Sequence, residues 1–579
     1  MARAAKNRGS ELSAALAACR KAFIGVALFS ALLNILYLTG SFYMLEVYDR
    51  VLPSRSVPTL VGITLLALVL FGFQGVLDII RSRLLVRVGS SLDGAVSERV
   101  HHVLMKLPLK GAASQGLQPL RDLDQVRSFL STVGPAALFD LPWMPLYLAI
   151  CYLFHPLIGI VATAGGLILV VVALLTEVMT RKPSAEAAFH AGGRNSLAEA
   201  NRRNTEAVHA MGMAGRLGAL WSDCNQNYMA AQQRAADIAA GFGGLSKVLR
   251  MALQSGVLGV GAWLVINQQA TAGIIIASSI LTSRALAPIE LAISQWRGFV
   301  AARQSWRRLN ILLDKIPAEP TRLALPKPVH SLAVEAASVA PPGTNRVVVQ
   351  DMAFHLKAGQ GLGIIGPSAS GKSSLARVLV GVWTAVRGGV RIDGAALDQW
   401  SSETLGPHVG YLPQDMELFA GTVAENIARF EPLPSAAAII AAANAAGVHE
   451  LVLGLPEGYE TQIGETGAAL SAGQRQRIGL ARALYGDPFL VVLDEPNASL
   501  DSEGDDALTW AIQGVRARGG IVVVIAHRPS ALAGVDTLLV MQAGRMAAFG
   551  PKETVLKQAL RPAPMPTPAP VRFAEGARA

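Results

Sequence analysis

Two glycines, Gly366 and Gly371, bracket four small residues, and Lys372 and Ser373 follow them directly. This is the pattern G-x-x-x-x-G-K-[ST], in which the glycines let successive backbone N–H groups point at the phosphates of a nucleotide. An apolar run precedes the pattern and a helical pattern follows it, so the start of the helix adds the positive end of its dipole. The sequence therefore predicts a phosphate-binding loop formed by Gly366, Pro367, Ser368, Ala369, Ser370, Gly371, Lys372, Ser373 and Ser374.

Within this loop we expect Lys372 to reach the β- and γ-phosphates and Ser373 to offer its hydroxyl to Mg²⁺. Further along, the stretch FLVVLDE is an apolar run that ends in two carboxylates, Asp494 and Glu495. Buried strands often end in an acidic residue, so the pair alone is weak evidence. Beside a phosphate loop it predicts hydrolysis at the γ-phosphate of a nucleotide, with Asp494 in the Mg²⁺ shell and Glu495 polarising the attacking water.

The elements around these residues predict the class of domain. Short β-rich runs (RVVVQ, GLGIIG, FLVVLDE and IVVVIAH) alternate with Ala-rich helical patterns. That alternation is typical of an α/β domain with a largely parallel sheet, whose strand ends would bring the loop and the carboxylates together.

The first half of the chain has a different character. Only 16% of the 579 residues are charged and 51% are hydrophobic, and the apolar excess lies in this half. Six apolar runs each reach the ~20 residues that a membrane span needs, and Lys247, Arg250, Arg284 and Glu290 interrupt the last two. The expected spans are Ala22–Leu45, Val57–Ile80, Pro135–Phe154, Leu157–Val178, Leu245–Ile266 and Ala272–Ile293.

The distribution of charge predicts the orientation of these spans. The formal net charge is +10, and most Lys and Arg residues of this half lie in the N-terminal segment and in two long polar stretches, 81–132 and 180–239. By the positive-inside rule these segments are cytoplasmic, as is the second half of the chain. The positive charge then reflects topology, and we expect no nucleic-acid partner. The three cysteines, Cys19, Cys151 and Cys224, lie far apart, which argues against a disulfide framework or a zinc site.

The two polar stretches contain few helix breakers, so we expect them to extend the spanning helices rather than to form structureless loops.

Further motifs in the second half make a family resemblance specific. The stretch LSAGQ, residues 470–474, resembles the LSGGQ signature of ABC transporter ATPases, and YLPQD, NASLD and VIAHR match other elements of that family in order. The resemblance covers about residues 332–555. It implies that Gln414 touches Mg²⁺ and senses the membrane domain, that Asp501 ends the D-loop, and that His527 contacts the γ-phosphate. It also implies that the signature binds the γ-phosphate of ATP held by the opposite subunit, through Ser471, Ala472, Gly473 and Gln474.

The sequence departs from the family at two positions. Ala472 stands where glycine is commoner, and we expect activity to survive because alanine is small and lies near a helix start. Pro341 stands where an aromatic residue usually stacks on adenine. We therefore expect adenine to be held more weakly or by another group.

Six spans followed by one ATPase domain correspond to a half-transporter of the exporter type, which implies a homodimer with two composite ATP sites. FYMLEVYDRVLPSRSVPTL, FDLPWMPLYLAI, APPG and ARALYGDPFLVVLDEPNASLD further resemble type I secretion permease/ATPases, most of all the alkaline-protease and lipase exporters. This resemblance implies export of an unfolded protein with a C-terminal signal across the bacterial inner membrane. The implied partners are a periplasmic membrane-fusion adaptor, a TolC-like outer-membrane channel and membrane lipids.

Several alternatives stay open. An exporter of lipids, peptides or drugs would share this architecture, whereas six spans argue against a soluble ABC ATPase, and the intact Lys372, Asp494, Glu495 and His527 argue against an inactive scaffold. The segment 117–130 is either a coupling helix or a helix surface without a special role. Arg284 either faces the transport path or the dimer interface, or the sixth span begins or ends elsewhere.

The predicted organisation has five parts: a cytoplasmic N-terminal segment (1–21), a transmembrane domain (22–317), a proline-marked linker (318–331), an ABC ATPase domain (332–560) and a Pro/Ala-rich tail (561–579) for which we expect disorder.

Overall fold

The computed structural model describes residues 10–111, 116–318, 322, 325–464 and 467–559. The chain divides into two compact units, residues 1–108 with 112–318, and residues 109–111 with 319–579. The predicted tail and parts of the predicted N-terminal segment and linker lie outside the described residues, so these domain bounds stay predictions.

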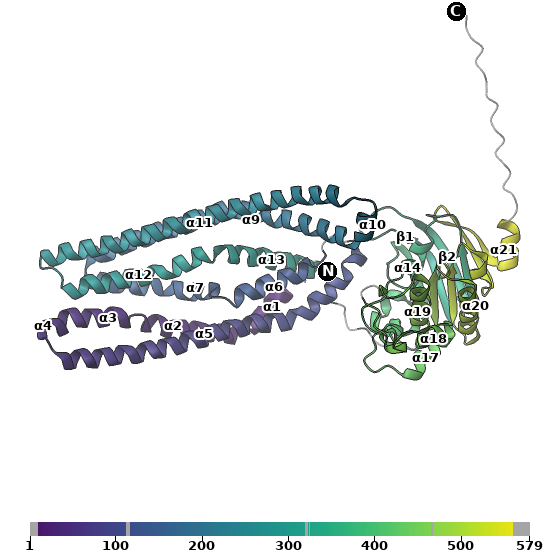
Figure 1. Cartoon of the computed structure of the whole chain (residues 1–579), viewed down its shortest axis with the longest axis horizontal. Coiled ribbons are helices and arrows are strands. Elements are labelled where there is room, and N and C mark those ends of the chain that lie inside the picture. Colours follow the sequence, from purple (N-terminus) through teal and green to yellow (C-terminus); the bar gives the residue numbers. More distant parts are fainter. Residues whose placement is uncertain (1–9, 112–115, 319–321, 323–324, 465–466, 560–579) are drawn as a thin grey trace, which may run out of the picture. The chain divides into compact units, whose positions relative to one another are not determined.

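The described part of the first unit consists of helices (Figure 1). Six helical segments within it are long and apolar enough to cross a membrane: Arg20–Ser54, Val57–Lys106, Gly134–Phe154, Pro156–Arg203, Ala214–Ile266 and Ala272–Ser294. The prediction of six spans is confirmed, including the last two, which charged residues interrupt. The helices of this unit are α1 (Glu11–Ala18), α2 (Arg20–Leu36), α3 (Thr39–Glu46), α4 (Leu52–Ser54), α5 (Val57–Lys106), α6 (Gln118–Leu130), α7 (Gly134–Asp140), α8 (Met144–Phe154), α9 (Pro156–Arg203), α10 (Thr205–Ala210), α11 (Ala214–Ile266), α12 (Ala272–Ser294) and α13 (Trp296–Lys315).

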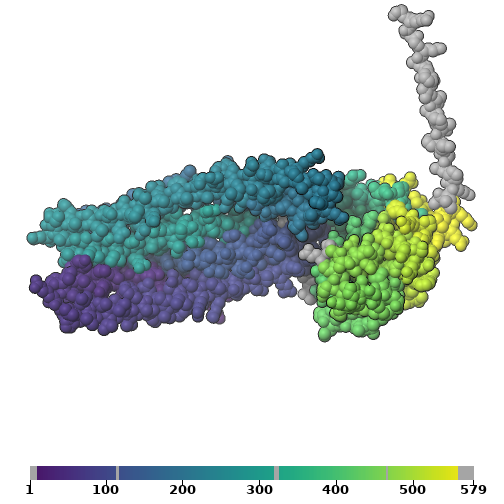
Figure 2. Space-filling view, in the orientation of Figure 1, coloured from purple at the N-terminus to yellow at the C-terminus, as the bar shows by residue number. Residues whose placement is uncertain are grey.

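The polar stretches continue the spanning helices, as predicted. α5 runs for 50 residues, α9 for 48 and α11 for 53, each well beyond its apolar part. Because a membrane span takes only ~20 residues, the remaining turns of each helix extend past the hydrocarbon layer. In Figure 2 the purple atoms of residues 10–100 lie along one side of this unit and the teal atoms along the other.

Helix α6 covers most of the segment 117–130 and buries one face within this unit. Pro119, Leu123 and Val126 pack inward, and Asp122 accepts hydrogen bonds from the Ser305 hydroxyl and from Nε of Arg308, both at 2.9 Å. The partners on α13 explain why this polar helix is held in place, whereas its role as a coupling helix stays a prediction.

The described part of the second unit contains two sheets. The six-stranded sheet has the order β10-β9-β3-β8-β7-β6, in which β9, β3, β8, β7 and β6 run parallel and β10 is antiparallel at the edge. It confirms the predicted largely parallel α/β domain. The four-stranded sheet, β2-β1-β4-β5, is antiparallel and was not predicted. The strands are β1 (Ser331–Val339), β2 (Val349–Lys357), β3 (Gly361–Ile365), β4 (Arg387–Ile392), β5 (Ala395–Ala396), β6 (Val409–Leu412), β7 (Leu490–Asp494), β8 (Ile521–Ile525), β9 (Thr537–Gln542) and β10 (Arg545–Pro551).

Helices cover the parallel sheet, and its central strands β7 and β8 are buried on both faces. All five residues of β7 and of β8 are buried, as expected for parallel strands between layers of helices. The helices of this unit are α14 (Lys372–Leu379), α15 (Ser402–Leu405), α16 (Val423–Ile427), α17 (Ala436–Ala445), α18 (His449–Leu453), α19 (Ala472–Leu484), α20 (Ser502–Ala517) and α21 (Lys552–Ala559).

Candidate active site

The carboxyl ends of four neighbouring strands meet at one edge of the parallel sheet. Ile364 of β3 pairs with Ile525 of β8, which also pairs with Asp494 at the end of β7, and Leu493 pairs with Leu412 of β6. Ligands of open α/β sheets bind at this edge, beyond the strand ends. The phosphate loop, the two carboxylates, His527 and Gln414 all follow these strands, so the sheet brings the predicted residues to one place.

The phosphate loop has the backbone that its glycines allow. Gly366 and Gly371 adopt φ values of 154° and 95°. A Cβ at Gly366 would lie 2.2 Å from the Met541 carbonyl oxygen, and one at Gly371 would lie 2.8 Å from that of Val348. Both positions therefore require glycine for space as well as for conformation.

Lys372 is the first residue of α14, and 6% of its surface is exposed. Its ammonium donates to the carbonyl oxygens of Gly366 and Pro367, each at 2.9 Å, so the side chain lies back along the loop. Burial lowers the pKa of this lysine, while Glu495 and Asp494 act in the opposite direction. A bound anionic phosphate would replace the two carbonyls as a stronger partner for the ammonium.

Asp494 closes β7 and is buried, with 2% exposed. Burial raises the pKa of this carboxyl group, and a hydrogen bond with the Ser373 side chain acts against that rise. Among the described residues, Oδ1 of Asp494 and Oγ of Ser370 are buried polar atoms without a hydrogen-bond partner. Such atoms carry a desolvation cost unless a ligand satisfies them, and a carboxylate oxygen could hold a cation while a hydroxyl could donate to a phosphate.

Glu495 and His527 form the next layer of the site. Nε2 of His527 lies 3.1 Å from Oε1 of Glu495, and Glu495 adopts φ +52°, in the left-handed region that non-glycine residues rarely occupy. Its backbone N–H donates to the Ile525 carbonyl at 2.9 Å, which ties the strained residue to β8.

The LSAGQ residues form the start of α19. Ser471 is the N-cap: its hydroxyl accepts from the Gln474 N–H at 3.3 Å, and the Gln474 side chain accepts from the Ser471 N–H at 2.9 Å. Ala472 is the first helical residue and lies at the surface, which explains why alanine fits there. Within the parts of the chain that the structure describes, no hydrogen bond joins residues 471–474 to the phosphate loop.

Two of the remaining predicted residues are exposed. Gln414 follows β6, and Asp501 caps α20, accepting from the Gly504 N–H at 3.0 Å and pairing with Arg477. These donors hold the pKa of the Asp501 carboxyl below its ordinary value. Pro341 lies in a turn closed by the Thr344 N–H, which donates to the Pro341 carbonyl at 3.0 Å.

Sequence reasoning missed Gln476, which connects α19 to the catalytic loop. Its amide donates to the carbonyls of Glu495 (3.2 Å) and Pro496 (2.5 Å), and its oxygen accepts from the Ser499 N–H at 2.9 Å. Gln476 lies two residues after the LSAGQ stretch, and this position could have marked it as a candidate site residue.

Comparison with known proteins agrees with this fold. The ABC transporter family matches residues 349–498, and the ABC transporter transmembrane region matches residues 23–287. The structure is similar to that of a bacterial Atm1-family ABC exporter with ATP bound, with a TM-score of 0.82 and 23% identity over 94% of this chain and 97% of that one. This chain belongs to the ABC transporter family and is a multi-pass membrane protein with an ATPase domain.

Within that family its similarity to type I secretion proteins is high. It is 60% identical to the type I secretion system ATP-binding protein PrsD of Rhizobium meliloti, over 96% of each chain. It is 30% identical to the cyclolysin secretion/processing ATP-binding protein CyaB of Bordetella pertussis, over 92% of this chain and 75% of that protein. The chain belongs with the type I secretion ATP-binding proteins, and the resemblance predicted from its motifs is confirmed.

Proposed function

We propose that this chain is the ATP-driven inner-membrane component of a type I secretion system, and that it exports an unfolded protein with a C-terminal signal. One observation carries the proposal: a single chain combines six spans with an ATP site whose residues lie at the carboxyl ends of β3, β7 and β8. The 60% identity to a type I secretion protein over nearly the whole chain supports protein as the cargo.

The working unit we propose is a homodimer with two composite sites. The phosphate loop of one copy and Ser471, Ala472, Gly473 and Gln474 of the other would hold each ATP. The capped start of α19 supports this arrangement, because the N–H groups at a helix start can bind an anion. Among the described residues, no hydrogen bond joins this helix start to the phosphate loop of the same copy, so it is available to the ATP of the other copy. ATP would thus draw the two ATPase domains together.

Each site residue has a distinct role in this proposal. The loop N–H groups and Lys372 bind the phosphates, Glu495 orients and polarises the attacking water, and His527 contacts the γ-phosphate while its 3.1 Å contact fixes the Glu495 side chain. Asp501 shapes the D-loop at the start of α20. Hydrolysis would separate the two domains and reset the membrane helices.

Mg²⁺ fits the donor set at this site. Ser373, Gln414 and Asp494 supply the hard oxygen ligands that this ion prefers, and the unpartnered Oδ1 of Asp494 is available to it. The ion would neutralise phosphate charge during hydrolysis.

The proposed assembly has its ATPase domains in the cytoplasm and is surrounded by lipids. Its partners are a periplasmic membrane-fusion adaptor and a TolC-like outer-membrane channel. The placement of Lys and Arg around the spans supports this orientation.

The test compares proteins in the culture medium of cells with wild-type protein or with Glu495→Gln, measured by mass spectrometry. Loss of one protein, or a small set, from the medium together with its accumulation in the cell would support protein secretion. An unchanged medium, with purified wild-type protein still hydrolysing ATP, would reject protein cargo and direct attention to lipids, peptides or drugs. Glu450→Gln, an exposed carboxylate on α18, serves as the matched control.

A further inference from the structure

The first membrane span is broken inside its apolar run. α2 ends at Leu36 and α3 begins at Thr39, and Leu38 N–H donates to the Ile35 carbonyl at 3.1 Å, a tighter turn than the α-helical one. The Tyr37 N–H still donates to the Leu33 carbonyl at 2.9 Å, and Tyr37 and Leu38 keep right-handed helical backbone angles. The break is therefore one tight turn between two helical segments of the same span.

Arg284 of the sixth span contacts this break. Its guanidinium carbon lies 4.7 Å from the centroid of the Tyr37 ring. Arg284 is exposed, whereas its neighbours Ala285 and Leu286 are buried, so it lies on the open face of α12 with Ala287, one turn further on. A charge on a face open to lipid is costly, so this face meets water or a polar partner.

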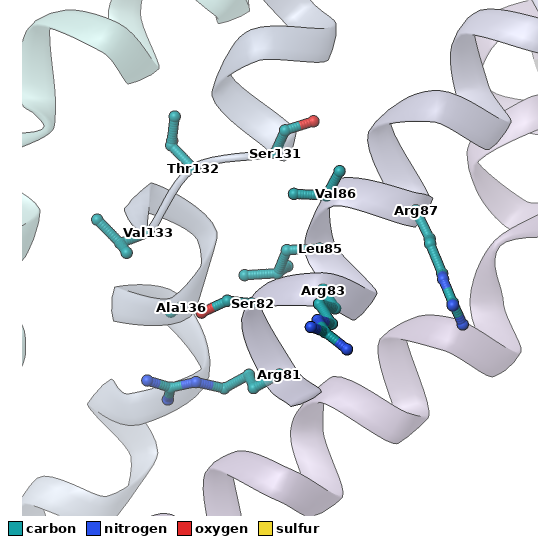
Figure 3. Close-up of a pocket in the computed structure, with 10 residues that line it drawn as sticks. All are labelled: Arg81, Ser82, Arg83, Leu85, Val86, Arg87, Ser131, Thr132, Val133 and Ala136. Carbon is teal, nitrogen blue, oxygen red and sulfur yellow. The ribbon is translucent and has the colours of Figure 1, made fainter. Parts of the chain in front are cut away.

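Four polar residues deeper in the bundle, Asn34, Arg81, Asp140 and Tyr147, are already paired with one another. NH1 of Arg81 lies 3.0 Å from Oδ2 of Asp140, Asn34 donates to Oδ1 of Asp140 at 2.8 Å, and the Tyr147 hydroxyl donates to the Asn34 carbonyl at 2.7 Å. Figure 3 shows Arg81 directed toward the helix that carries Ala136, in a pocket of about 510 Å³. This network is satisfied and holds spans one, two and three together.

Arg284 differs from these groups, because the described residues offer it no carboxylate and no hydrogen-bond acceptor. Its five N–H donors are fixed in a planar fork that matches carboxylate oxygens and can also serve backbone carbonyls. The Tyr37 ring holds the face of the guanidinium and leaves its edge free to donate.

We propose that Arg284 and Tyr37 form a contact site in the transport path that binds carbonyl and carboxylate oxygens of the passing polypeptide. The inference rests on the proposed function. An unfolded chain presents a carbonyl at every residue, and each needs a donor wherever water is scarce. A fixed guanidinium supplies that donor and favours acidic segments over basic ones, which makes Arg284 a residue that determines specificity.

The first experiment measures whether the open face of α12 is wet. Ala287→Cys is introduced into the full-length protein after Cys19, Cys151 and Cys224 are replaced by alanine, and is treated in membranes with a membrane-impermeant maleimide. Val69→Cys, on span two at 68% exposure, is the lipid-facing control. We expect labelling of position 287 and not of position 69. Equal protection of both, or a spontaneous disulfide between two copies at 287 with no labelling, would overturn the proposal in favour of lipid or the dimer interface.

The second experiment measures export of the proteins that Glu495→Gln removes from the medium. Arg284→Gln should slow their export about tenfold, the factor that one lost charge-assisted hydrogen bond implies, with basal ATP hydrolysis unchanged. Arg284→Lys should be intermediate, Tyr37→Phe should behave as wild type, and Tyr37→Leu should resemble Arg284→Gln. Arg83→Gln, an exposed arginine of α5, is the control for the loss of a positive charge.

Normal export by Arg284→Gln would reject the contact site while leaving the proposed function intact. A medium unaffected by Glu495→Gln would reject the proposed function itself, so the two failures are distinguishable. If Arg284→Gln does not accumulate in the membrane, Tyr37→Leu, which keeps the charge, decides the question by the same measurement.

Discussion

Glu495 has a strained backbone conformation and lies directly after β7. Its left-handed backbone places a carboxylate beyond the end of β7, beside His527 and one residue after the buried Asp494. A non-glycine residue persists in this conformation only where its surroundings fix it, and such residues gather at functional sites. Here the N–H bond to Ile525 and the carbonyl bond from Gln476 provide that fixation.

We expect Glu495→Gln to lower ATP hydrolysis by roughly a hundredfold or more, because the amide cannot accept the proton of the attacking water. ATP binding should persist, since the phosphate loop is unchanged. Phosphate release and the affinity for a fluorescent ATP analogue, measured on purified protein, check both parts. Turnover close to that of Glu450→Gln would show that another group is the base.

Gly371→Ala should abolish ATP binding. The new Cβ would meet the Val348 carbonyl oxygen at 2.8 Å in a left-handed backbone, a conformation that costs a non-glycine residue about 1–3 kcal/mol. Gly389→Ala on β4 is the matched control, because its Cβ would meet nothing within 4 Å. Nucleotide affinity and the thermal midpoint of the ATPase unit are measured together. Intact affinity in Gly371→Ala would mean that the loop adopts a different conformation when ATP binds.

At the scale of elements, α19 is connected to the loop that follows β7 through one side chain. Gln476→Ala removes two donated bonds and one accepted bond around Glu495, Pro496 and Ser499. We expect kcat for ATP hydrolysis to fall while KM changes little, because the change loosens the catalytic loop and spares the phosphate loop. Gln513→Ala, on the exposed face of α20, should leave both constants unchanged. A rise in KM alone would place Gln476 in ATP binding instead.

Some of these elements could be predicted from the sequence and others could not. The phosphate loop, Asp494 and Glu495 follow short apolar runs whose β-branched residues predict buried strands, so local pattern sufficed. The antiparallel sheet escaped prediction because β1, SLAVEAASV, is rich in alanine and serine, and its pairing with β4 joins residues far apart in the chain. The break at Tyr37 was not predicted, although Thr39, Gly40 and Ser41 interrupt the apolar run directly after it.

At the scale of the whole molecule, an ion pair joins helices that the sequence does not connect. Arg81 and Asp140 lie 59 residues apart, and the sequence alone does not pair them. Arg81 also contacts Asp78 at 2.7 Å and the Ser30 hydroxyl at 3.2 Å, so the pair is the centre of a network across three spans.

Breaking this pair from one side should destabilise the membrane unit. Arg81→Met alone leaves the buried Asp140 carboxylate without its cationic partner, at a cost of about 3–5 kcal/mol. Asp140→Leu should cost less, because the guanidinium keeps its contact with Asp78. The double variant should recover much of the loss seen in Arg81→Met, because no buried charge is left unpaired and the Asp78 side chain is half exposed. Thermal unfolding of the full-length protein in detergent micelles tests this, with Arg83→Met as the control. A double variant less stable than both single variants would show that the network contributes net stability.

The continuous helices have a mechanical consequence. At 1.5 Å per residue, the 50 residues of α5 measure about 75 Å, so a rotation of about 5° around one end would move the other by about 6 Å. Such a rod acts as a lever that converts a small angular change into a displacement wide enough to admit a side chain. Pro183 lies inside α9 and lacks the N–H that would continue the helical hydrogen bonds, so α9 can bend at this residue. α5 has no proline after its first turn, and it transmits force along its whole length.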